Sequence, residues 1–273
     1  MESEAALEYA ATRRCRVARL QAGKWLHTED DLAEEVPVAL EYNGISHAVM
    51  LATPADLEEF AVGFSLSEGI IASARDIRGI DLEETEAGIT VHLEIGSEAF
   101  LNLKQRRRNL TGRTGCGLCG TESLDQALRP LPRVAAKGKL AAGAVHRALA
   151  DLKQHQPINR TTGATHAAAW ADASGELLFG FEDVGRHNAL DKLIGAMARQ
   201  GIDASAGFVV MTSRGSVELV QKAATVGITA LVVISAPTAL AVRTAEQCGM
   251  TLIAFARGDE FVAYANAENI ILD

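Results

Sequence analysis

Apolar residues in the C-terminal half of the chain form short continuous runs separated by amphipathic segments. The runs at 207–213, 228–235 and 250–258 (GFVVMTS, ITALVVIS and MTLIAFARG) are typical of strands buried on both faces. The segments between them, 215–227 and 236–249, have helical periodicity. This alternation predicts a β-α-β-α-β unit, in which parallel strands form a sheet with helices packed on it.

The part of this half that precedes the unit adds further elements. Residues 141–156 (AAGAVHRALADLKQHQ) are helical in pattern, and so are residues 186–200, with Gly201 as the expected end of that helix. Two apolar runs flank Ser174-Gly175, which predicts a β-hairpin. The whole second half therefore reads as one α/β domain.

The N-terminal half has a different pattern of apolar and polar positions. Residues 37–53 predict a hairpin with its turn at Asn43-Gly44. A helix is expected next, with Thr53 as its cap, Pro54 at its first position and Gly69 at its end. Residues 88–96 (GITVHLEIG) alternate apolar and polar side chains, as in a half-buried strand. The acidic residues between positions 29 and 35 indicate a solvated surface.

A basic run separates the two halves. Residues 102–115 (NLKQRRRNLTGRTG) contain five Lys or Arg residues and no acid, and they read as a solvated linker. We place the domain boundary there. The prediction is a smaller N-terminal α+β domain at 1–110 and an α/β domain with a mixed or parallel sheet at 111–273.

Composition and charge argue against several classes of protein. Apolar residues make up 48% and charged residues 22% of 273 positions, which is an ordinary globular balance. A net charge of −9 argues against a general attraction to nucleic acid or anionic membranes. The N-terminus has no apolar signal region, and the most apolar stretch is too interrupted to span a bilayer. We expect a cytoplasmic protein with reduced thiols, in which Cys15 and a buried Cys248 are bystanders.

Two cysteines three positions apart stand out in GRTGCGLCGT (112–121). Cys116 and Cys119 suit a metal site, a redox pair or a sulfur carrier. A zinc deaminase has H-x-E before P-C-x-x-C, which His92 and Glu94 imitate. However, Gly115 stands where the proline belongs, and His92 falls on the predicted strand, so we expect no zinc.

The other two uses of the cysteines stay open at this point. A thioredoxin-like pair belongs at the start of a helix after a strand, whereas this pair lies in a loop with four glycines. Such a loop can carry a thiol to a partner, which favours group transfer. The upstream basic run would stabilise a thiolate or persulfide anion.

The carboxyl ends of the predicted parallel strands form a second candidate region. They are Thr212–Ser216, Ser235–Thr238 and Phe255–Glu260, and the first two lead into helices. Ligand sites in α/β sheets lie at this edge, where free N–H groups of helix N-termini favour anions. Serine and threonine at these positions are also ordinary helix caps.

Several segments, taken together and in order, resemble the formate dehydrogenase accessory sulfurtransferases of the FdhD/NarQ family. The resemblance runs from about Glu35 to the C-terminus. The segments that carry it are GRTGCGLCG, TGATHAAAW, EDVGRHNALDKLIG, TSRGSVELVQKAA, ISAPTALAV and TLIAFARGDEF, with AVGFSLSEGII as a further match in which Ser65 replaces an aliphatic residue.

The resemblance implies a function and a fold. Such proteins receive sulfur as a persulfide from a cysteine desulfurase and pass it to the molybdenum cofactor, bis-molybdopterin guanine dinucleotide, which formate dehydrogenase needs. Their catalytic domain is similar to cytidine deaminase without its zinc, and they are homodimers. Two rival functions stay open: a chaperone that binds this cofactor without handling sulfur, and a zinc-dependent deaminase-type hydrolase.

The resemblance also implies the site residues. Cys116 corresponds to the persulfide bearer, and Cys119 is the second catalytic candidate. The cofactor segment corresponds to Phe255, Ala256, Arg257, Gly258, Asp259 and Glu260, which would hold the guanine nucleotide portion. The strand-end argument adds Ser213 and Arg214. Five polar residues of the matching motifs have no assigned role, with Asp183 expected as a helix cap and Lys192 on a solvated face: His166, Asp183, Arg186, His187 and Lys192.

Overall fold

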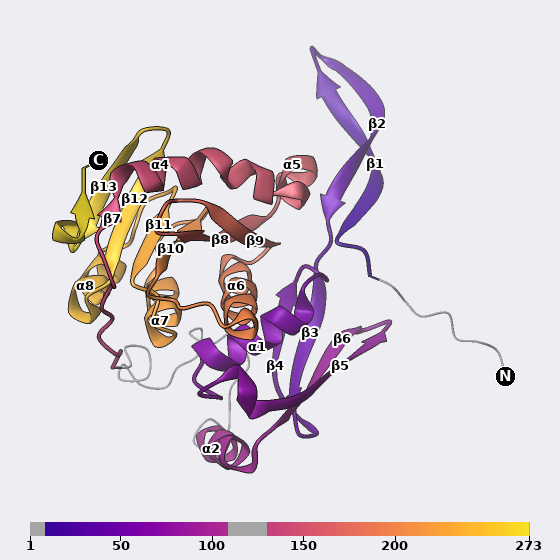
Figure 1. Ribbon diagram of the computed structural model, residues 1–273. Coiled ribbons are helices and arrows are strands. Elements are labelled where there is room, and N and C mark those ends of the chain that lie inside the picture. Colours follow the sequence, from indigo (N-terminus) through magenta and orange to yellow (C-terminus); the bar gives the residue numbers. More distant parts are fainter. Residues whose placement is uncertain (1–8, 109–129, 273) are drawn as a thin grey trace.

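The computed structural model describes residues 9–108 and 130–272. Two sheets organise these residues, one of four strands near the N-terminus and one of six strands near the C-terminus (Figure 1). A two-stranded ribbon, β1 (Thr12–Gln21) and β2 (Lys24–Ala33), extends away from both sheets. The architecture is mixed α/β, as the sequence predicts.

The four-stranded sheet has the order β4-β3-β6-β5. Its strands are β3 (Val36–Tyr42), β4 (Ile45–Ala52), β5 (Ile77–Thr85) and β6 (Gly88–Ile95). The β3–β4 hairpin turns at Asn43 and Gly44, whose φ angles of 47° and 77° are those of a tight hairpin turn. Strand β6 alternates as predicted, with its apolar residues buried and Thr90, His92 and Glu94 toward the other face.

Two helices follow the strands of this sheet, together with a short 3-10 turn. They are α1 (Leu57–Ser67), η1 (Ala74–Asp76) and α2 (Ser97–Arg108). Apolar side chains of α1 and α2 pack with those of the strands in one core, to which Leu40, Phe60, Leu93 and Leu103 belong. Helix α2 is a correction, because residues 102–108 of the basic run were expected to be linker and are helical.

The start of α1 also differs from the prediction. The helix begins at Leu57 after Asp56 in the left-handed region, and not at Pro54 behind a Thr53 cap. The Thr53 hydroxyl accepts a hydrogen bond from Val184 N, 131 residues away, at 3.1 Å. Thr53 therefore joins the two halves of the chain instead of capping a helix. Gly69 follows the end of α1 in the left-handed region, as expected.

The six-stranded sheet has the order β13-β12-β11-β10-β8-β9. Its strands are β8 (His166–Asp172), β9 (Leu177–Asp183), β10 (Gly207–Met211), β11 (Ala230–Val233), β12 (Thr251–Arg257) and β13 (Glu260–Ala265). Strands β10, β11 and β12 are parallel, which confirms the predicted β-α-β-α-β unit. Strand β8 is antiparallel to β10, and β13 is antiparallel to β12, so the sheet is mixed.

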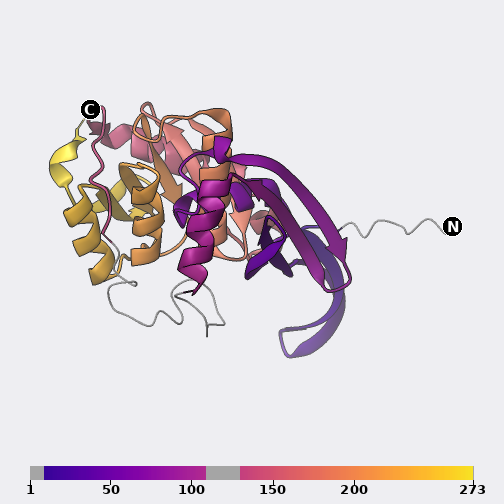
Figure 2. The same ribbon diagram turned by 90° about the horizontal axis from the view of Figure 1, so that it is seen from below.

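Helices cover both faces of this sheet (Figures 1 and 2). One core lies between the sheet and α6 (Arg186–Gln200), α7 (Val217–Thr225) and α8 (Ala239–Cys248). The other core lies between the sheet and α4 (Ala142–Asp151). The chain continues from α4 through η2 (Leu152–His155) into α5 (Pro157–Thr162). Short elements complete the fold: β7 (Leu140–Ala141), η3 (Ala267–Asn269) and β14 (Ile270–Ile271).

The two sheets are joined by close packing of α1 against α6. A Cβ atom on Gly63 would lie 1.7 Å from the carbonyl oxygen of Asp191, and one on Gly195 would lie 1.9 Å from that of Glu59. Only glycine fits at either position while the helix backbones stay this close. The four-stranded sheet is therefore held rigidly against the helical face of the second sheet.

Candidate functional site

The carboxyl ends of the three parallel strands lie side by side. The carbonyl of Ser213 accepts a hydrogen bond from Ser235 N at 3.4 Å, and the carbonyl of Ser235 accepts one from Phe255 N at 3.3 Å. Gly215 and Pro237 form a further parallel bridge beyond the strands. The three predicted strand-end segments thus meet along one edge, which we call the strand-end edge.

Two helices begin at this edge. In α8 the hydroxyl of Thr238 accepts a hydrogen bond from Ala241 N at 3.2 Å, so this N-terminus is capped by its own side chain. In α7 the N-cap residue Ser216 makes no side-chain cap bond. The positive end of the α7 dipole therefore faces the edge without a side-chain cap.

The strand-end edge extends further than the sequence predicted, across β8 and β9. His166 starts β8 opposite Asp183 at the end of β9, and Ala167 N donates to the Thr212 hydroxyl at 2.9 Å. Helix α6 begins three residues after Asp183 with Arg186 and His187. In the sequence, the apolar run at 175–183 ends directly before the helical pattern at 186–200, and this was a signal for a strand end at the site. The sequence analysis used residues 175–183 only as one strand of a hairpin.

Arg186 and His187 present buried polar atoms at this edge. Within the described residues, neither Arg186 Nε nor His187 Nε2 has a hydrogen-bond partner. Burial, followed by the charge of Arg186, lowers the pKa of His187 to about 4. The same two causes, in the same order, lower the pKa of His166. The Glu218 carboxylate in the first turn of α7 interacts with both His187 and Arg186. Imidazoles, a guanidinium and a carboxylate therefore lie together, a set that suits a polar ligand.

The segment Phe255–Glu260 is the end of β12, a two-residue turn at Gly258 and Asp259, and the first residue of β13. Phe255 has a φ angle of 51°, and Gly258 one of 57°, so the chain reverses and Arg257 pairs with Glu260. Ala256 is buried, whereas Arg257, Gly258, Asp259 and Glu260 are exposed. The structure thus brings this segment to the edge occupied by Ser213, two strands away, or about 10 Å at ordinary strand spacing.

Arg214 and Arg257 are both exposed at this edge. Neither guanidinium forms a hydrogen bond or an ion pair with another of the described residues. Arg186, Arg214 and Arg257 come from three different connections, so their charges are spread along the edge. An extended anion such as a dinucleotide matches that spread better than a single small ion.

Beneath the edge, a buried ion pair ties the two halves together. Lys192 Nζ lies 2.8 Å from Asp183 Oδ2, and both side chains are fully buried. Asp183 also accepts hydrogen bonds from Thr53 N, Gly185 N and the Asn188 amide. The expectation of a solvated Lys192 is wrong, because this lysine neutralises the carboxylate that organises the start of α6.

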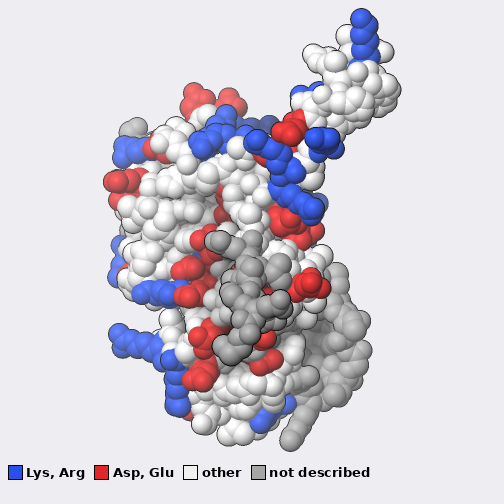
Figure 3. All heavy atoms as spheres, turned by 90° about the vertical axis from the view of Figure 1, so that its right-hand side faces the viewer, with Lys and Arg blue, Asp and Glu red and all other residues white. Residues whose placement is uncertain are grey.

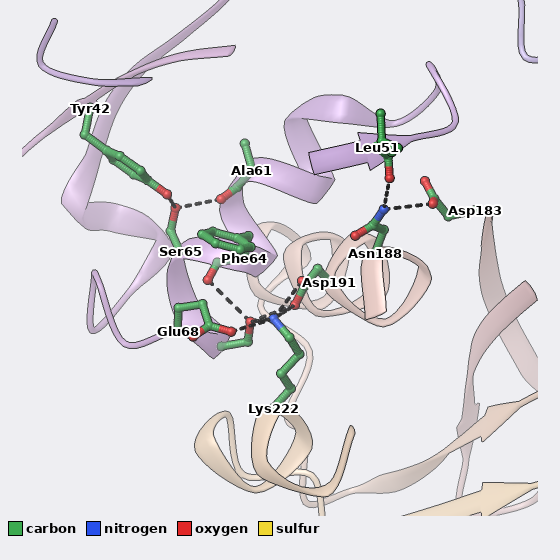
Figure 4. A network of polar contacts seen from close by, with 11 residues as sticks. Tyr42, Leu51, Ala61, Phe64, Ser65, Glu68, Asp183, Asn188, Asp191 and Lys222 are labelled. Atoms are coloured by element: carbon green, nitrogen blue, oxygen red, sulfur yellow. Dashed lines mark hydrogen bonds and ion pairs between the residues drawn. The ribbon is translucent and has the colours of Figure 1, made fainter. Parts of the chain in front are cut away.

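A second buried network lies deeper between α1, α6 and α7 (Figure 4). Lys222 Nζ lies 2.8 Å from both Asp191 Oδ2 and Glu68 Oε1, and it also contacts the Ser67 hydroxyl at 3.0 Å. The Phe64 ring lies 5.1 Å from the same ammonium group. These contacts join α7, which begins at the strand-end edge, to α1 of the other half.

Comparison with known proteins places the chain in a family. The model of the FdhD/NarQ family matches residues 33–271. The chain belongs to the FdhD/NarQ family. A protein of Cupriavidus necator named sulfur carrier protein FdhD is 54% identical over 93% of this chain and 88% of its own length. A protein of the same name from Bordetella bronchiseptica is 52% identical over 88% of this chain and 87% of its own length.

A solved structure supports the fold of this FdhD/NarQ member. It is a putative formate dehydrogenase accessory protein from Desulfotalea psychrophila, with a TM-score of 0.74. The likeness covers 96% of this chain and all of the other at 22% identity. At that identity it bears on the fold alone, and it confirms the mixed α/β architecture.

The paired cysteines of this FdhD/NarQ chain, Cys116 and Cys119, lie outside the described residues. Of the other two cysteines, Cys248 ends α8 and is buried, and burial raises the pKa of its thiol. Cys15 lies on β1 and is partly exposed. Cys248 was expected to be buried at a helix end, and that expectation is confirmed.

The residues that imitate a zinc deaminase motif lie on the four-stranded sheet, on β6. The two ring nitrogens of His92 each lie 3.0 Å from a carboxylate oxygen, one of Glu41 and one of Glu83. The hydrogen bond to Glu83, together with that to Glu41, raises the pKa of His92. Among the described residues, no group of three or more potential metal ligands is found.

The described helices were compared with what a membrane span requires. None of those within residues 9–108 and 130–272 combines the length and the apolar character that crossing a bilayer requires.

Proposed function

We propose that this protein carries sulfur for formate dehydrogenase, as a persulfide on Cys116. The observation that carries the proposal is family membership across residues 33–271, a range that includes the cysteine pair. Relatives more than half identical over most of the chain are named sulfur carriers. The proposal covers the enzyme class as well, a sulfurtransferase with a covalent cysteine intermediate.

Loading requires only an exchange between two cysteines. The Cys116 thiolate attacks the terminal sulfur of a persulfide on a cysteine desulfurase. A new S–S bond forms on Cys116, the S–S bond of the donor breaks, and the donor cysteine leaves as a thiolate. The step consumes no oxidant. Lys104 and the arginines that follow it in the sequence favour the anionic form of a nearby thiol.

Delivery as sulfide needs two electrons, and Cys119 is placed in the sequence to supply them. Its thiolate attacks the inner sulfur of the Cys116 persulfide, which forms a Cys116–Cys119 disulfide and expels hydrosulfide to the acceptor. A cellular dithiol then reduces the disulfide. This assignment gives the two cysteines different roles, the first as bearer and the second as the resolving thiol.

The acceptor in this proposal is the molybdenum cofactor, bis-molybdopterin guanine dinucleotide, bound at the strand-end edge. The phosphates would meet Arg186, Arg214 and the N-terminus of α7 with Ser213 beside it. The guanine would lie at Phe255–Glu260, where Asp259 or Glu260 can accept from its N–H groups. The partnerless buried atoms of Arg186 and His187 support a polar ligand here. The cofactor is the substrate of sulfur transfer, and no zinc takes part.

The sheet with helices on both faces is compatible with a cytidine-deaminase-like domain at 111–273, beside a smaller domain at 1–110. The proposed partners are a cysteine desulfurase and formate dehydrogenase in the cytoplasm, and the protein acts as a homodimer. Nucleic acid and membranes have no role in it.

Mass spectrometry after incubation with a cysteine desulfurase and cysteine tests the covalent step. We expect one additional sulfur atom on Cys116, and none in Cys116→Ala. The Cys119→Ala variant should load sulfur and retain it, because the resolving thiol is absent. Cys15→Ala, far away in the sequence, is the matched control and should load normally. Sulfur on neither paired cysteine would refute the carrier and leave a cofactor chaperone.

Binding of GDP tests the place of the acceptor. Replacing Arg257 or Arg214 with alanine removes a charge-assisted hydrogen bond worth about 1.5–3 kcal/mol, or roughly a 10- to 150-fold loss of affinity. Arg75 is an exposed arginine on η1 of the other half, and Arg75→Ala serves as control. Unchanged GDP affinity in both edge variants would place the nucleotide elsewhere.

A further inference from the structure

His92, the histidine of the zinc-deaminase-like motif, lies between carboxylates of two neighbouring strands. It is on β6, which lies between β3 and β5 in the four-stranded sheet. Its Nδ1 atom lies 3.0 Å from Glu41 Oε1 on β3, and its Nε2 atom lies 3.0 Å from Glu83 Oε2 on β5. The three side chains therefore form a row across three strands. The proposed sulfur carriage makes no use of them.

The two carboxylate partners determine the protonation state of the ring. An ionised carboxylate only accepts hydrogen bonds, whereas a neutral imidazole has a single N–H group. Both contacts of His92 are satisfied at once only when both ring nitrogens carry hydrogen, as in the imidazolium ion. The hydrogen bond to Glu83 raises the pKa of His92, burial lowers it, and the hydrogen bond to Glu41 raises it again. The net shift of the pKa is upward, so the sheet stabilises the charged ring.

The surroundings of the ring are otherwise acidic. Asp81 on β5 lies directly opposite His92, and Glu94 lies two residues further along β6 on the same face. On this face of the four described strands, every charged side chain other than His92 is therefore a carboxylate: Glu41, Asp81, Glu83 and Glu94. Like charges on neighbouring strands destabilise a sheet. Loss of the ring proton would leave these carboxylates together without a cation between them.

Strand β5 is the part of the sheet that depends most on this contact. It lies at one edge of the sheet, where β6 is its partner, and residues 81–85 are all exposed. Little apolar burial therefore holds this end of the strand. A further contact comes from the Tyr9 hydroxyl, which donates to the carbonyl of Thr85 at 2.7 Å. Segments with so few buried contacts are the first to open in a folded protein.

We infer that His92 is a proton-dependent clamp that holds the exposed end of β5 to the four-stranded sheet. The protonated ring donates to Glu41 and to Glu83 and so links three strands. After the ring loses its proton, one of the two carboxylates has no donor and the acidic side chains repel one another. The end of β5 then depends on its pairing with β6, and it opens more often.

The direction of the pH effect follows from the raised pKa of His92 in the folded protein. The stability that the clamp contributes is complete below the ordinary histidine value of about 6.5, and it is lost as the pH rises through the higher folded value. The effect reaches beyond the sheet, because opening of β5 at Thr85 also releases Tyr9, three residues before β1. It does not depend on sulfur carriage, since neither the cysteine pair nor the strand-end edge takes part.

An NMR titration of the His92 ring tests its protonation state. The midpoint should lie above about 6.5, and at about pH 6 both ring nitrogens should show the chemical shifts of a protonated imidazole. Glu83→Gln should lower the midpoint, because the hydrogen bond to Glu83 is the largest cause of the raised pKa. A midpoint at 6.5 or below in the unmodified protein would overturn the inference.

Hydrogen exchange of the β5 amides tests the clamp itself. Protection, expressed relative to the intrinsic exchange rate at each pH, should fall about two- to fivefold between about pH 6 and 8.5, which is the size expected of a largely exposed ion pair. His92→Gln should abolish this dependence and leave β5 at the lower protection throughout. Glu83→Gln should reduce the dependence as well, since it removes the charged partner on β5.

His27→Gln is the matched control, because His27 is an exposed histidine on β2. This variant should keep the pH dependence of the unmodified chain. Circular dichroism at both ends of the pH range should show that all variants remain folded. Constant protection of β5 across the range, or a His92→Gln chain with the pH dependence of the unmodified protein, would each contradict the clamp.

Discussion

The pair of Asp183 and Lys192 shows how single buried residues support the strand-end edge. Asp183 accepts hydrogen bonds from three donors and lies against Lys192, and it fixes the turn that brings Arg186 and His187 to the edge. A carboxylate that is fully buried is tolerated only while a charge and donors compensate it. The pair is thus structural, although it lies directly below the strand-end edge.

Removal of the lysine tests this role. Lys192→Met should lower the free energy of unfolding by about 3–5 kcal/mol, because it leaves the Asp183 carboxylate buried without its countercharge. The double variant Lys192→Met with Asp183→Asn should lose less, since the amide is neutral and still accepts a hydrogen bond. Urea unfolding of the three proteins measures both effects. Equal stability of the unmodified and Lys192→Met proteins would show that the pair is dispensable.

His187 gives a pH-dependent prediction. Its pKa is about 4 in the folded protein, because of burial and the charge of Arg186, against an ordinary value of about 6.5. The folded state therefore resists protonation. The stability associated with neutral His187 is complete above pH 6.5 and is lost as the pH falls from there through 4.

The free energy of unfolding should fall by about 2–3 kcal/mol between pH 6.5 and 4, since His187 is mostly but not wholly buried. His187→Gln should flatten the fall in unfolding free energy between pH 6.5 and 4, as measured by urea unfolding at several pH values. His27 on the exposed ribbon is the control position, and His27→Gln should leave the slope unchanged. An NMR titration of His187 with a midpoint near 6.5 would contradict the prediction.

At the residue scale, the sequence correctly predicted the backbone conformation of positions where it depends on adjacent residues alone. The Asn43-Gly44 turn and the left-handed Gly201 at the end of α6 follow from local backbone preferences. Thr53 and Lys192 were misread because their partners lie more than 100 and about 10 residues away, respectively. Only the folded chain shows that these polar side chains meet.

At the scale of elements, the contact between α1 and α6 determines how the two halves fit. Gly63→Ala would place a methyl group 1.7 Å from the carbonyl oxygen of Asp191, so the helices must separate. We expect this overpacking to lower the unfolding free energy by at least about 1–3 kcal/mol, despite the better helix propensity of alanine.

Gly138 is the matched control for that substitution, because a Cβ atom there meets no heavy atom within 4 Å. Gly138→Ala should change the unfolding free energy by less than about 0.5 kcal/mol. Thermal and urea unfolding of both variants provide the comparison. A Gly63→Ala protein as stable as the Gly138→Ala protein would mean that the helices can move apart without loss.

The elements that the sequence predicted well are those whose burial alone dictates the residue type. Strands β10, β11 and β12 are buried on both faces, so they appear as continuous apolar runs. The ribbon was missed because most of its side chains are exposed within one chain, so no alternating apolar pattern marks it. Helix α2 was missed for a related reason, since it ends in Lys and Arg residues that resemble a linker.

At the scale of the whole molecule, the candidate site lies on one edge of the six-stranded sheet. The strand-end edge of the six-stranded sheet gathers arginines and helix N-termini, and its position was predicted in part from the ends of the parallel strands. Its extension across β8 to α6 could not be predicted, because it depends on the antiparallel placement of β8 beside β10. The β1–β2 ribbon contacts α5, whose Ile158 and Asn159 N–H groups donate to Glu182 at the end of β9 (Figure 3 shows the ribbon beside the body).

Transfer of labelled sulfur from this protein to formate dehydrogenase tests the central proposal most directly. The carrier is loaded with radiolabelled sulfur by a desulfurase, separated from it, and mixed with formate dehydrogenase made without an accessory protein. We predict that label appears in the dehydrogenase together with formate oxidation, and that Cys116→Ala supplies neither. Formate oxidation that rises equally with the Cys116→Ala protein would contradict sulfur carriage on this residue.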